Sequence, residues 1–258
     1  MKMILTGAGG ALGGSVAAAL SSAGAALILL GRNPARLPLL PRSWTRAFTL
    51  ATARPEDFDG GEMLLLLPPT TRPDWVAACQ HGIATAAAAG VKALVYLSLA
   101  GARLDSPLAL SRNQARVEEA LINSGLDYTL LRANLLQERL LATFDGQQFS
   151  GPAAPVAALA RADLAAVLVQ VLLDRARGST AHQRRAYELS GPEALRLAEV
   201  AERLAVGYEP TAPTDALQEV WASGQLALPT PTLATLLGRP PQPLAETLAT
   251  LGGGAGQD

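Results

Sequence analysis

The sequence is poor in the residues that build disulfide, zinc and lysine-dependent sites. Its 258 residues include one cysteine, Cys79, and two histidines, His81 and His182. One thiol cannot form a disulfide framework, and with two imidazoles it cannot form a Cys/His zinc cage, so we expect no metal site. Lysine occurs only as Lys2 and Lys92, which both begin apolar runs. A mechanism that needs a catalytic lysine must therefore use one of these two.

An excess of one charge and long apolar runs are also missing. The 21 basic and 22 acidic residues give a net charge of -1, whereas nucleic-acid binders need a clear basic excess. No run approaches the roughly 20 apolar residues of a membrane span. The N-terminus mimics a secretory signal, but residues 6–10 and 13–15 interrupt its apolar stretch. We therefore expect a soluble cytoplasmic protein that binds neither nucleic acid nor membrane.

Short apolar runs alternate with helical stretches through the first 135 residues. The runs are continuous rather than alternating with polar residues, which is typical of strands covered on both faces. They cover residues 2–5, 26–30, 47–50, 62–67, 93–99 and 128–131. Helices are predicted over residues 11–23, 74–89 and 106–124, each followed by glycine. The alternation predicts an α/β fold, a Rossmann-type doubly wound parallel sheet.

The composition changes after about residue 150. Ten of the 18 prolines lie beyond that point. There we predict helices over 161–174 and 193–205, a short strand over 187–189, and otherwise short helices and loops rather than another sheet. The chain is therefore divided into a sheet domain over 1–150, a smaller, mostly helical lobe over 151–251, and a flexible tail over 252–258.

A glycine-rich turn directly follows the first predicted strand. It reads Thr6-Gly7-Ala8-Gly9-Gly10-Ala11-Leu12-Gly13. In such a turn Gly7 allows a sharp bend, Gly10 allows close approach of a pyrophosphate, and Gly13 lets the helix pack against the sheet. The start of the helix offers the N–H groups of Ala11 and Leu12 to phosphates. The alternative interpretation is a tight turn without a ligand.

The end of the second strand indicates which dinucleotide would bind. A protein that binds NAD usually has an acidic residue there for the ribose hydroxyls. This chain has Arg32, which can form a charge-assisted pair with a 2′-phosphate, so the pattern favours NADP. Arg36, one helical turn later, can assist. The alternative for both arginines is a solvated surface position.

Four segments together resemble the NmrA-like group of atypical short-chain dehydrogenase/reductases. They are TGAGGALGG, ALVYLSLAGA, VEEALINSGLDYTLLRANLLQERL and LLGRPPQPLAETLA. Within that group the sequence is most similar to the bacterial NADPH-dependent quinone oxidoreductases, along nearly the whole chain. The resemblance implies that residues 1–150 form an NAD(P)-binding Rossmann domain that holds NADPH, and that residues 151–251 form a substrate-side lobe.

The resemblance also implies which residues bind the cofactor. They are Thr6, Gly7, Gly10, Ala11, Leu12, Gly13, Arg32, Leu67, Pro68 and Ser98. Leu67 and Pro68 stand where relatives lay backbone against the ribose and nicotinamide, and Ser98 ends the fifth strand. The sequence departs from the family at residues 133–136, where relatives have a proline-glycine pair and an aromatic residue. It also departs at residues 52–53, where an acidic residue often holds adenine.

The Tyr-x-x-x-Lys dyad of ordinary short-chain dehydrogenases is missing, because no tyrosine here has lysine four residues later. Gln114 takes the approximate place of the lysine, so alcohol oxidation by that dyad is excluded and the catalytic residue is unknown. Hydride transfer to a quinone does not need the dyad, since water can protonate a hydroquinone anion. On the substrate side, Ser98, Gln114 and Asn134 can hydrogen-bond a carbonyl oxygen, and Leu136 lies nearby in sequence.

These observations predict an NADPH-dependent oxidoreductase that transfers hydride to a small quinone-like electrophile. The alternative is a non-catalytic NADP(H)-binding redox sensor of the NmrA type, which regulates a protein partner. Reduction of an imine or a carbon–carbon double bond is a third option. A small-molecule substrate is expected, and a homodimer or a regulatory protein partner stays open.

Overall fold

The computed structural model describes residues 1–252, which form two compact units that are interleaved in sequence. Unit 1 comprises residues 1–98, 113–131 and 165–187, and unit 2 comprises residues 99–112, 132–164 and the chain from Glu188 onward. The division into domains at residue 150 stays a prediction. Of the predicted flexible tail, Gly252 is the last residue of a helix, and residues 253–258 lie outside the described residues.

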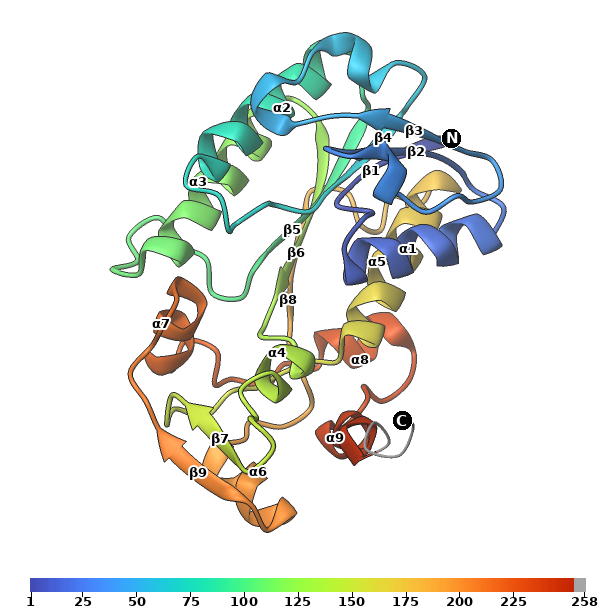
Figure 1. The fold of residues 1–258 in the computed structure, drawn as a ribbon. Coiled ribbons are helices and arrows are strands. Elements are labelled where there is room, and N and C mark those ends of the chain that lie inside the picture. The colour runs from blue at the N-terminus through green and yellow to red at the C-terminus, as the bar shows by residue number, and fades with distance from the viewer. Residues whose placement is uncertain (253–258) are drawn as a thin grey trace. The chain divides into compact units, whose positions relative to one another are not determined.

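The chain alternates strands and helices in its first half and becomes more helical later (Figure 1). The strands are β1 (Lys2–Thr6), β2 (Ala26–Gly31), β3 (Ser43–Ala47), β4 (Met63–Leu66), β5 (Ala93–Leu99), β6 (Asp127–Ala133), β7 (Gln148–Gly151), β8 (Arg185–Leu189) and β9 (Gly207–Pro210). The α-helices are α1 (Ala11–Ser22), α2 (Trp75–Ala88), α3 (Ala109–Asn123), α4 (Gln137–Leu141), α5 (Arg161–Ala176), α6 (Leu197–Leu204), α7 (Ala216–Ala222), α8 (Thr232–Leu237) and α9 (Leu244–Gly252). Short 3-10 helices are η1 (Pro34–Arg36), η2 (Leu50–Thr52) and η3 (Pro55–Phe58).

Seven strands form one sheet in the order β3-β2-β1-β4-β5-β6-β8. β1 pairs in parallel with β2 and with β4, and the pairs β2–β3 and β4–β5 are also parallel. The order of the first six strands is that of a doubly wound dinucleotide-binding sheet, in which the strand order, and not the strand direction, reverses between β1 and β4. The predicted fold class is therefore confirmed.

Backbone bonds at both ends of β6 extend the parallel pairing to the last two strand pairs. Near its start, Asp127 N donates to Lys92 O beside β5, and Arg184 N donates to Tyr128 O beside β8. At its end, Ala100 N donates to Ala133 O, and Asn134 N donates to Leu189 O. The starts of β5, β6 and β8 therefore lie next to one another, and so do their ends. All seven carboxyl ends therefore lie at one edge of the sheet.

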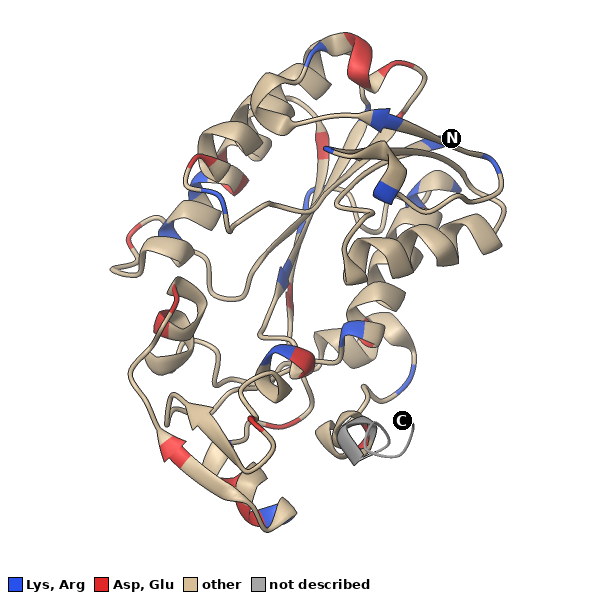
Figure 2. Cartoon of the chain, viewed as in Figure 1, with Lys and Arg blue, Asp and Glu red and all other residues tan. Residues whose placement is uncertain are grey.

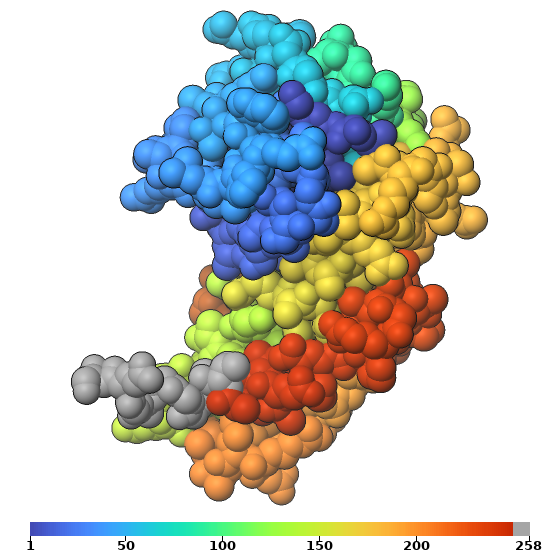
Figure 3. All heavy atoms as spheres, turned by 90° about the vertical axis from the view of Figure 1, so that its right-hand side faces the viewer, coloured from blue at the N-terminus to red at the C-terminus, as the bar shows by residue number. Residues whose placement is uncertain are grey.

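Helices cover both faces of the sheet, which explains the continuous apolar runs. In Figure 1, α1 and α5 lie on one face and α2 and α3 on the other. Figure 3 shows atoms of α5 (yellow) adjoining the blue atoms of the N-terminal segment. Residues 3–5 of β1 and all four residues of β4 are at most 1% exposed. Strands that are buried on both faces need no polar side, so the sequence signal is an apolar run.

The third strand differs from the prediction. We expected residues 47–50, whereas β3 covers Ser43–Ala47 and forms the edge of the sheet. An edge strand can carry polar and exposed residues, and Trp44 is 50% exposed. The apolar Phe48 and Leu50 are buried from the loop that follows, where Phe48 packs edge-on against Phe58 at 5.6 Å. The apolar run therefore marked core-filling residues rather than the strand.

The prediction that no further sheet follows residue 150 is wrong. In unit 2, β7 and β9 form a two-stranded parallel sheet that aligns Phe149 with Tyr208. Phe149 is buried with Leu197 and Trp221 in an apolar cluster, and Trp221 Nε1 donates to Ala154 O at 2.8 Å. The two strands are only four residues long and contain glycine and proline, so they carry no strand pattern.

Two predicted helices begin later than expected. α3 begins at Ala109 rather than at residue 106, because Ser106 Oγ accepts a bond from Leu108 N in a preceding turn. α6 begins at Leu197 rather than at residue 193. Within residues 1–252, no helix combines the length and apolar character that a membrane span requires. Basic and acidic residues are interspersed along the elements of each unit (Figure 2).

Candidate cofactor-binding site

The glycine turn after β1 has a backbone that only glycine accommodates at two positions. Gly7 has a φ of +74°, in the left-handed region that other residues rarely adopt. Gly10 N donates to Gly7 O at 3.0 Å, which closes the turn. A Cβ atom on Gly13 would lie 2.2 Å from Gly7 O. The turn and the start of α1 therefore pack backbone against backbone, as the glycine spacing predicts.

The start of α1 is exposed and has no side-chain cap. Gly10 is the N-cap residue, and the first bond of the helix runs from Gly14 N to Gly10 O at 2.8 Å. Within residues 1–252, the amides of Ala11, Leu12 and Gly13 have no acceptor. Gly10 and Ala11 are exposed. Three free N–H groups at the positive end of a helix favour an anion such as a phosphate.

The segment after β2 borders this turn. Asn33 Oδ1 accepts a bond from Ala35 N at 3.1 Å and thereby starts η1. A Cβ atom on Gly9 would lie 3.7 Å from Arg36 O, which places η1 beside the glycine turn. Arg32 and Arg36 are both exposed, and in the described part of the chain neither forms an ion pair. Their guanidinium groups are therefore available to an anionic ligand.

Thr6 connects the carboxyl ends of β1 and β4, where the strand order reverses. Its Oγ1 donates to Leu65 O at 3.3 Å and accepts a bond from Leu67 N at 2.9 Å. A Cβ atom on Gly7 would lie 3.2 Å from Leu67 Cβ, so Leu67 packs directly against the glycine turn. Pro68 follows and is half-buried. Thr6 therefore positions Leu67 and Pro68, and its hydroxyl is already hydrogen-bonded.

Ser98 near the end of β5 carries an unsatisfied hydroxyl. The residue is 5% exposed, and its Oγ has no hydrogen-bond partner among residues 1–252. Buried polar atoms are nearly always paired in folded proteins, with protein, water or ligand. Ser98 lies at the same edge of the sheet as the glycine turn, because β1, β4 and β5 run in parallel and both positions are at carboxyl ends of strands. The free hydroxyl fits a polar atom of a ligand bound at that edge.

Besides Ser98, three residues were predicted on the substrate side; the side chains of two of them are hydrogen-bonded within the fold, and the third lies at the start of a helix. Gln114 is buried in unit 1, where its Oε1 accepts a bond from Tyr96 OH at 2.5 Å. Asn134 is buried in unit 2, where its Nδ2 donates to Leu226 O at 3.0 Å and its Oδ1 accepts from its neighbour Leu135 N. Leu136 is half-buried at the N-cap of α4. Contact of any of them with substrate stays a prediction.

Burial removes two other groups from acid–base or nucleophilic chemistry. Tyr96 is fully buried, and burial raises the pKa of its phenol well above the usual value. Burial also raises the pKa of the Cys79 thiol to about 12. At neutral pH both groups keep their protons. His81 donates to Ala53 O at 3.0 Å and thus holds the loop after β3.

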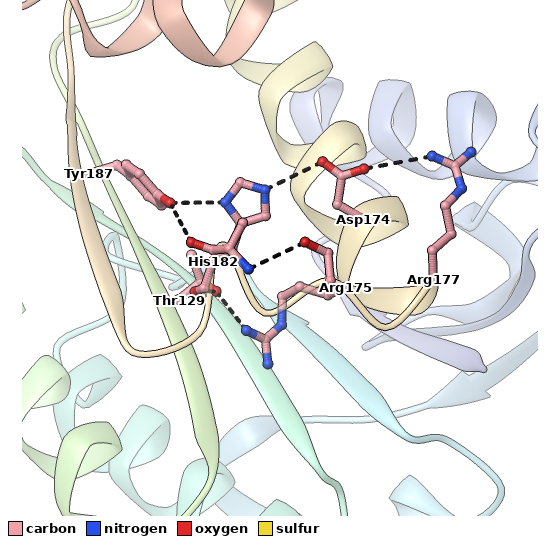
Figure 4. Close-up of polar contacts among 8 residues, drawn as sticks. Thr129, Asp174, Arg175, Arg177, His182 and Tyr187 are labelled. Carbon is pink, nitrogen blue, oxygen red and sulfur yellow. Dashed lines mark hydrogen bonds and ion pairs between the residues drawn. The ribbon is translucent and has the colours of Figure 1, made fainter.

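A second polar cluster in unit 1 lies at the turn between α5 and β8 (Figure 4). His182 is buried and bridges Tyr187 OH, at 2.9 Å from Nδ1, and Asp174 Oδ2, at 3.4 Å from Nε2. Its carbonyl accepts a bond from Thr129 Oγ1, which also contacts Arg175. This turn precedes β8, whereas the glycine turn follows β1. The cluster therefore lies at the opposite edge of the sheet and is not part of the candidate site.

Comparison with known proteins identifies relatives over nearly the whole chain. Residues 7–175 match the model of a family described as NAD(P)H-binding. The chain is 30% identical over 279 residues to a (4-alkanoyl-5-oxo-2,5-dihydrofuran-3-yl)methyl phosphate reductase of Streptomyces griseus, with 95% of each chain covered. It is also 30% identical over 290 residues to quinone oxidoreductase 2 of Escherichia coli, with 96% of this chain and 97% of the relative covered.

A solved structure supports the same comparison. The Escherichia coli NADPH-dependent quinone oxidoreductase, crystallised with NADPH, superimposes with a TM-score of 0.83 at 27% identity. The alignment covers 97% of this chain and 99% of that chain. The resemblance to NADPH-dependent quinone oxidoreductases that the sequence indicated is therefore confirmed.

Proposed function

The chain belongs to the NAD(P)H-binding family, and we propose that it uses NADPH to reduce a quinone or a similarly flat, conjugated small molecule. The observation that carries this proposal is the exposed, uncapped start of α1 after the glycine turn. The relatives named as reductases and as a quinone oxidoreductase support the reaction class.

The residues at the carboxyl edge of unit 1 fit NADPH. The free amides of Ala11, Leu12 and Gly13 would hold the pyrophosphate, and Gly10, which has no side chain, would let it approach the backbone. Arg32 would pair with the 2′-phosphate, because its guanidinium is exposed and lacks an acidic partner within residues 1–252.

Two further positions would contact the rest of the cofactor. Leu67 and Pro68 would border the ribose and nicotinamide side, since Thr6 fixes them against the glycine turn. Ser98 would donate its free hydroxyl to the nicotinamide amide or to an oxygen of the substrate.

The reaction needs little acid–base help from the chain. When bound, NADPH supplies a hydride, which carries two electrons to the quinone. The reduced quinone oxygen then takes one proton, which water can supply because a hydroquinone anion is a stabilised product. Tyr96 is unsuited to a relay, because it is fully buried with a raised pKa and bonded to Gln114. The chain therefore acts by binding, orientation and exclusion of water.

The test is turnover with purified protein. NADPH is mixed with a panel of simple benzoquinones and naphthoquinones, and the loss of reduced-nicotinamide absorbance is followed. The proposal expects oxidation of NADPH that depends on the quinone and the protein and that NADH supports less well. Tight binding of NADPH without turnover on any quinone would refute the reductase proposal. That outcome would favour the redox sensor that the sequence left open.

Other parts of the sequence-based prediction stay predictions. They are the cytoplasmic location, a homodimer or regulatory protein partner, and the substrate-side roles of Gln114, Asn134 and Leu136. A small-molecule substrate follows from the proposed reaction.

A further inference from the structure

The loop that follows β5 is held in one conformation by side chains from several elements of unit 2. The peptide group after Ala100 is bonded on both sides: Gln225 Nε2 donates to Ala100 O at 2.7 Å, and Gly101 N donates to Glu188 Oε2 at 3.0 Å. Ser111 Oγ donates to Gly101 O at 3.2 Å. Gly101 itself has a φ of +71°, which a side chain would strain. Glycine at position 101 permits this backbone, and hydrogen bonds with Gln225, Glu188 and Ser111 hold it.

Glu188 joins the carboxyl ends of three neighbouring strands. It belongs to β8, its Oε2 accepts the amide of Gly101 after β5, and its Oε1 accepts Arg132 Nη1 from β6 at 3.0 Å. Each carboxylate oxygen thus has its own donor. Ligands of doubly wound folds bind at the carboxyl ends of the strands, so the bridge lies at the functional edge of the sheet.

Stability alone gives a weak reason for this arrangement. The side chains of Glu188 and Arg132 are 39% and 25% exposed, and ion pairs that reach water contribute little to stability. The carboxylate instead fixes a specific loop conformation. That loop begins at Ala100, two residues after Ser98, whose hydroxyl is buried and has no partner within residues 1–252.

We propose that Glu188 is a positioning residue of the reductase site, which holds the backbone after Ser98 through the amide of Gly101 and through Arg132. This inference rests on the proposed function, because the loop would position Ser98 for the cofactor or substrate. Glu188 acts through Gly101 and Arg132 and does not itself react.

The test compares Glu188→Gln and Glu188→Ala with the matched control Glu202→Gln. Glutamine keeps the shape of Glu188 but places an NH2 donor against a second donor, either Gly101 N–H or Arg132. Glu202 is exposed on α6, and its side chain has no hydrogen bond or ion pair in the described part of the chain. Two quantities are measured for each variant. One is hydrogen–deuterium exchange of the loop over 100–103, and the other is steady-state kinetics with NADPH and unsubstituted naphthoquinone.

We expect the exchange of the loop to rise about tenfold in Glu188→Gln, which corresponds to the loss of one charge-assisted bond. The kcat falls by a similar factor and falls further in Glu188→Ala, whereas the KM for NADPH and the melting temperature stay close to those of the wild type. Exchange and kcat equal to those of Glu202→Gln would overturn the proposal. A fall in melting temperature that accompanies the loss of kcat would also overturn it, because it indicates a general structural role.

The outcome is separable from that of the proposed function. A wild-type protein that turns over no quinone refutes the reductase proposal. In that case unchanged loop exchange in Glu188→Gln still overturns the role of Glu188, and raised exchange confined to residues 100–103 still supports it.

Discussion

Replacing Gly10 by alanine separates cofactor binding from folding. The backbone of Gly10 is extended, with φ -95° and ψ 166°, which alanine adopts without strain. The nearest atom to an added Cβ is Gly7 O at 3.5 Å, an ordinary contact. We therefore expect Gly10→Ala to change the free energy of unfolding by about 1 kcal/mol or less, the usual size of an N-cap effect.

In the proposed NADPH site, the added methyl group would stand in the way of a pyrophosphate that approaches the amides of Ala11 and Leu12. A hydrogen bond to a charged group contributes about 1.5–3 kcal/mol, so the loss of one such bond weakens NADPH binding by about tenfold or more. Titration calorimetry with NADPH and urea unfolding measure the two effects. Ser15→Ala, farther along the same helix, is the control that leaves the amides unchanged. Wild-type affinity for NADPH in Gly10→Ala would refute the assignment of the turn to the cofactor.

Three further predictions follow from contacts in unit 1. Gly13→Ala should lower both stability, by about 2 kcal/mol, and NADPH affinity, because its Cβ would lie 2.2 Å from Gly7 O; urea unfolding with unchanged stability would contradict the packing argument. Arg175→Met should cost about 3 kcal/mol and leave NADPH affinity unchanged, since Arg175 is buried and pairs with Asp127 at 2.6 Å at the opposite edge; lost affinity at full stability would contradict this. Burial raises the pKa of the Cys79 thiol from 9.0 to about 12, so the thiol ionises at a lower pH in the unfolded state than in the native state. The free energy of unfolding therefore falls as the pH rises from about 9 to about 12. Cys79→Ala should therefore lose less stability than the wild type between about pH 8 and pH 10.5 in urea unfolding, and equal losses would sink that reasoning.

The sequence predicted the sheet and the glycine turn well, because both depend on local patterns. Buried strands appear as apolar runs, and the turn requires glycine at fixed spacing. The structure gives the physical reason at Gly7 and Gly13, a positive φ and a 2.2 Å approach to a carbonyl. The position of Arg32 after β2 follows from the same register, so its exposure beside the turn was predictable.

Edge and long-range features were not predictable from local patterns. β3 needs no apolar run because it lies at the edge of the sheet, and the short strands β7 and β9 are held by pairing with each other. The hydrogen bonds of Asn134 to Leu226 and of Glu188 to Gly101 join residues 87 or more positions apart. Polar residues of this kind look like candidate substrate contacts or solvated residues until the fold supplies their partners.

The most direct test of the account is the affinity of the folded protein for NADPH and for NADH, measured by calorimetry in the wild type and in Arg32→Asp. We predict that NADPH binds more tightly than NADH to the wild type, and that Arg32→Asp weakens NADPH far more than NADH because a 2′-phosphate then meets a carboxylate instead of a guanidinium. Failure of both dinucleotides to bind the wild type, or equal effects of the substitution on the two, would contradict the central claim.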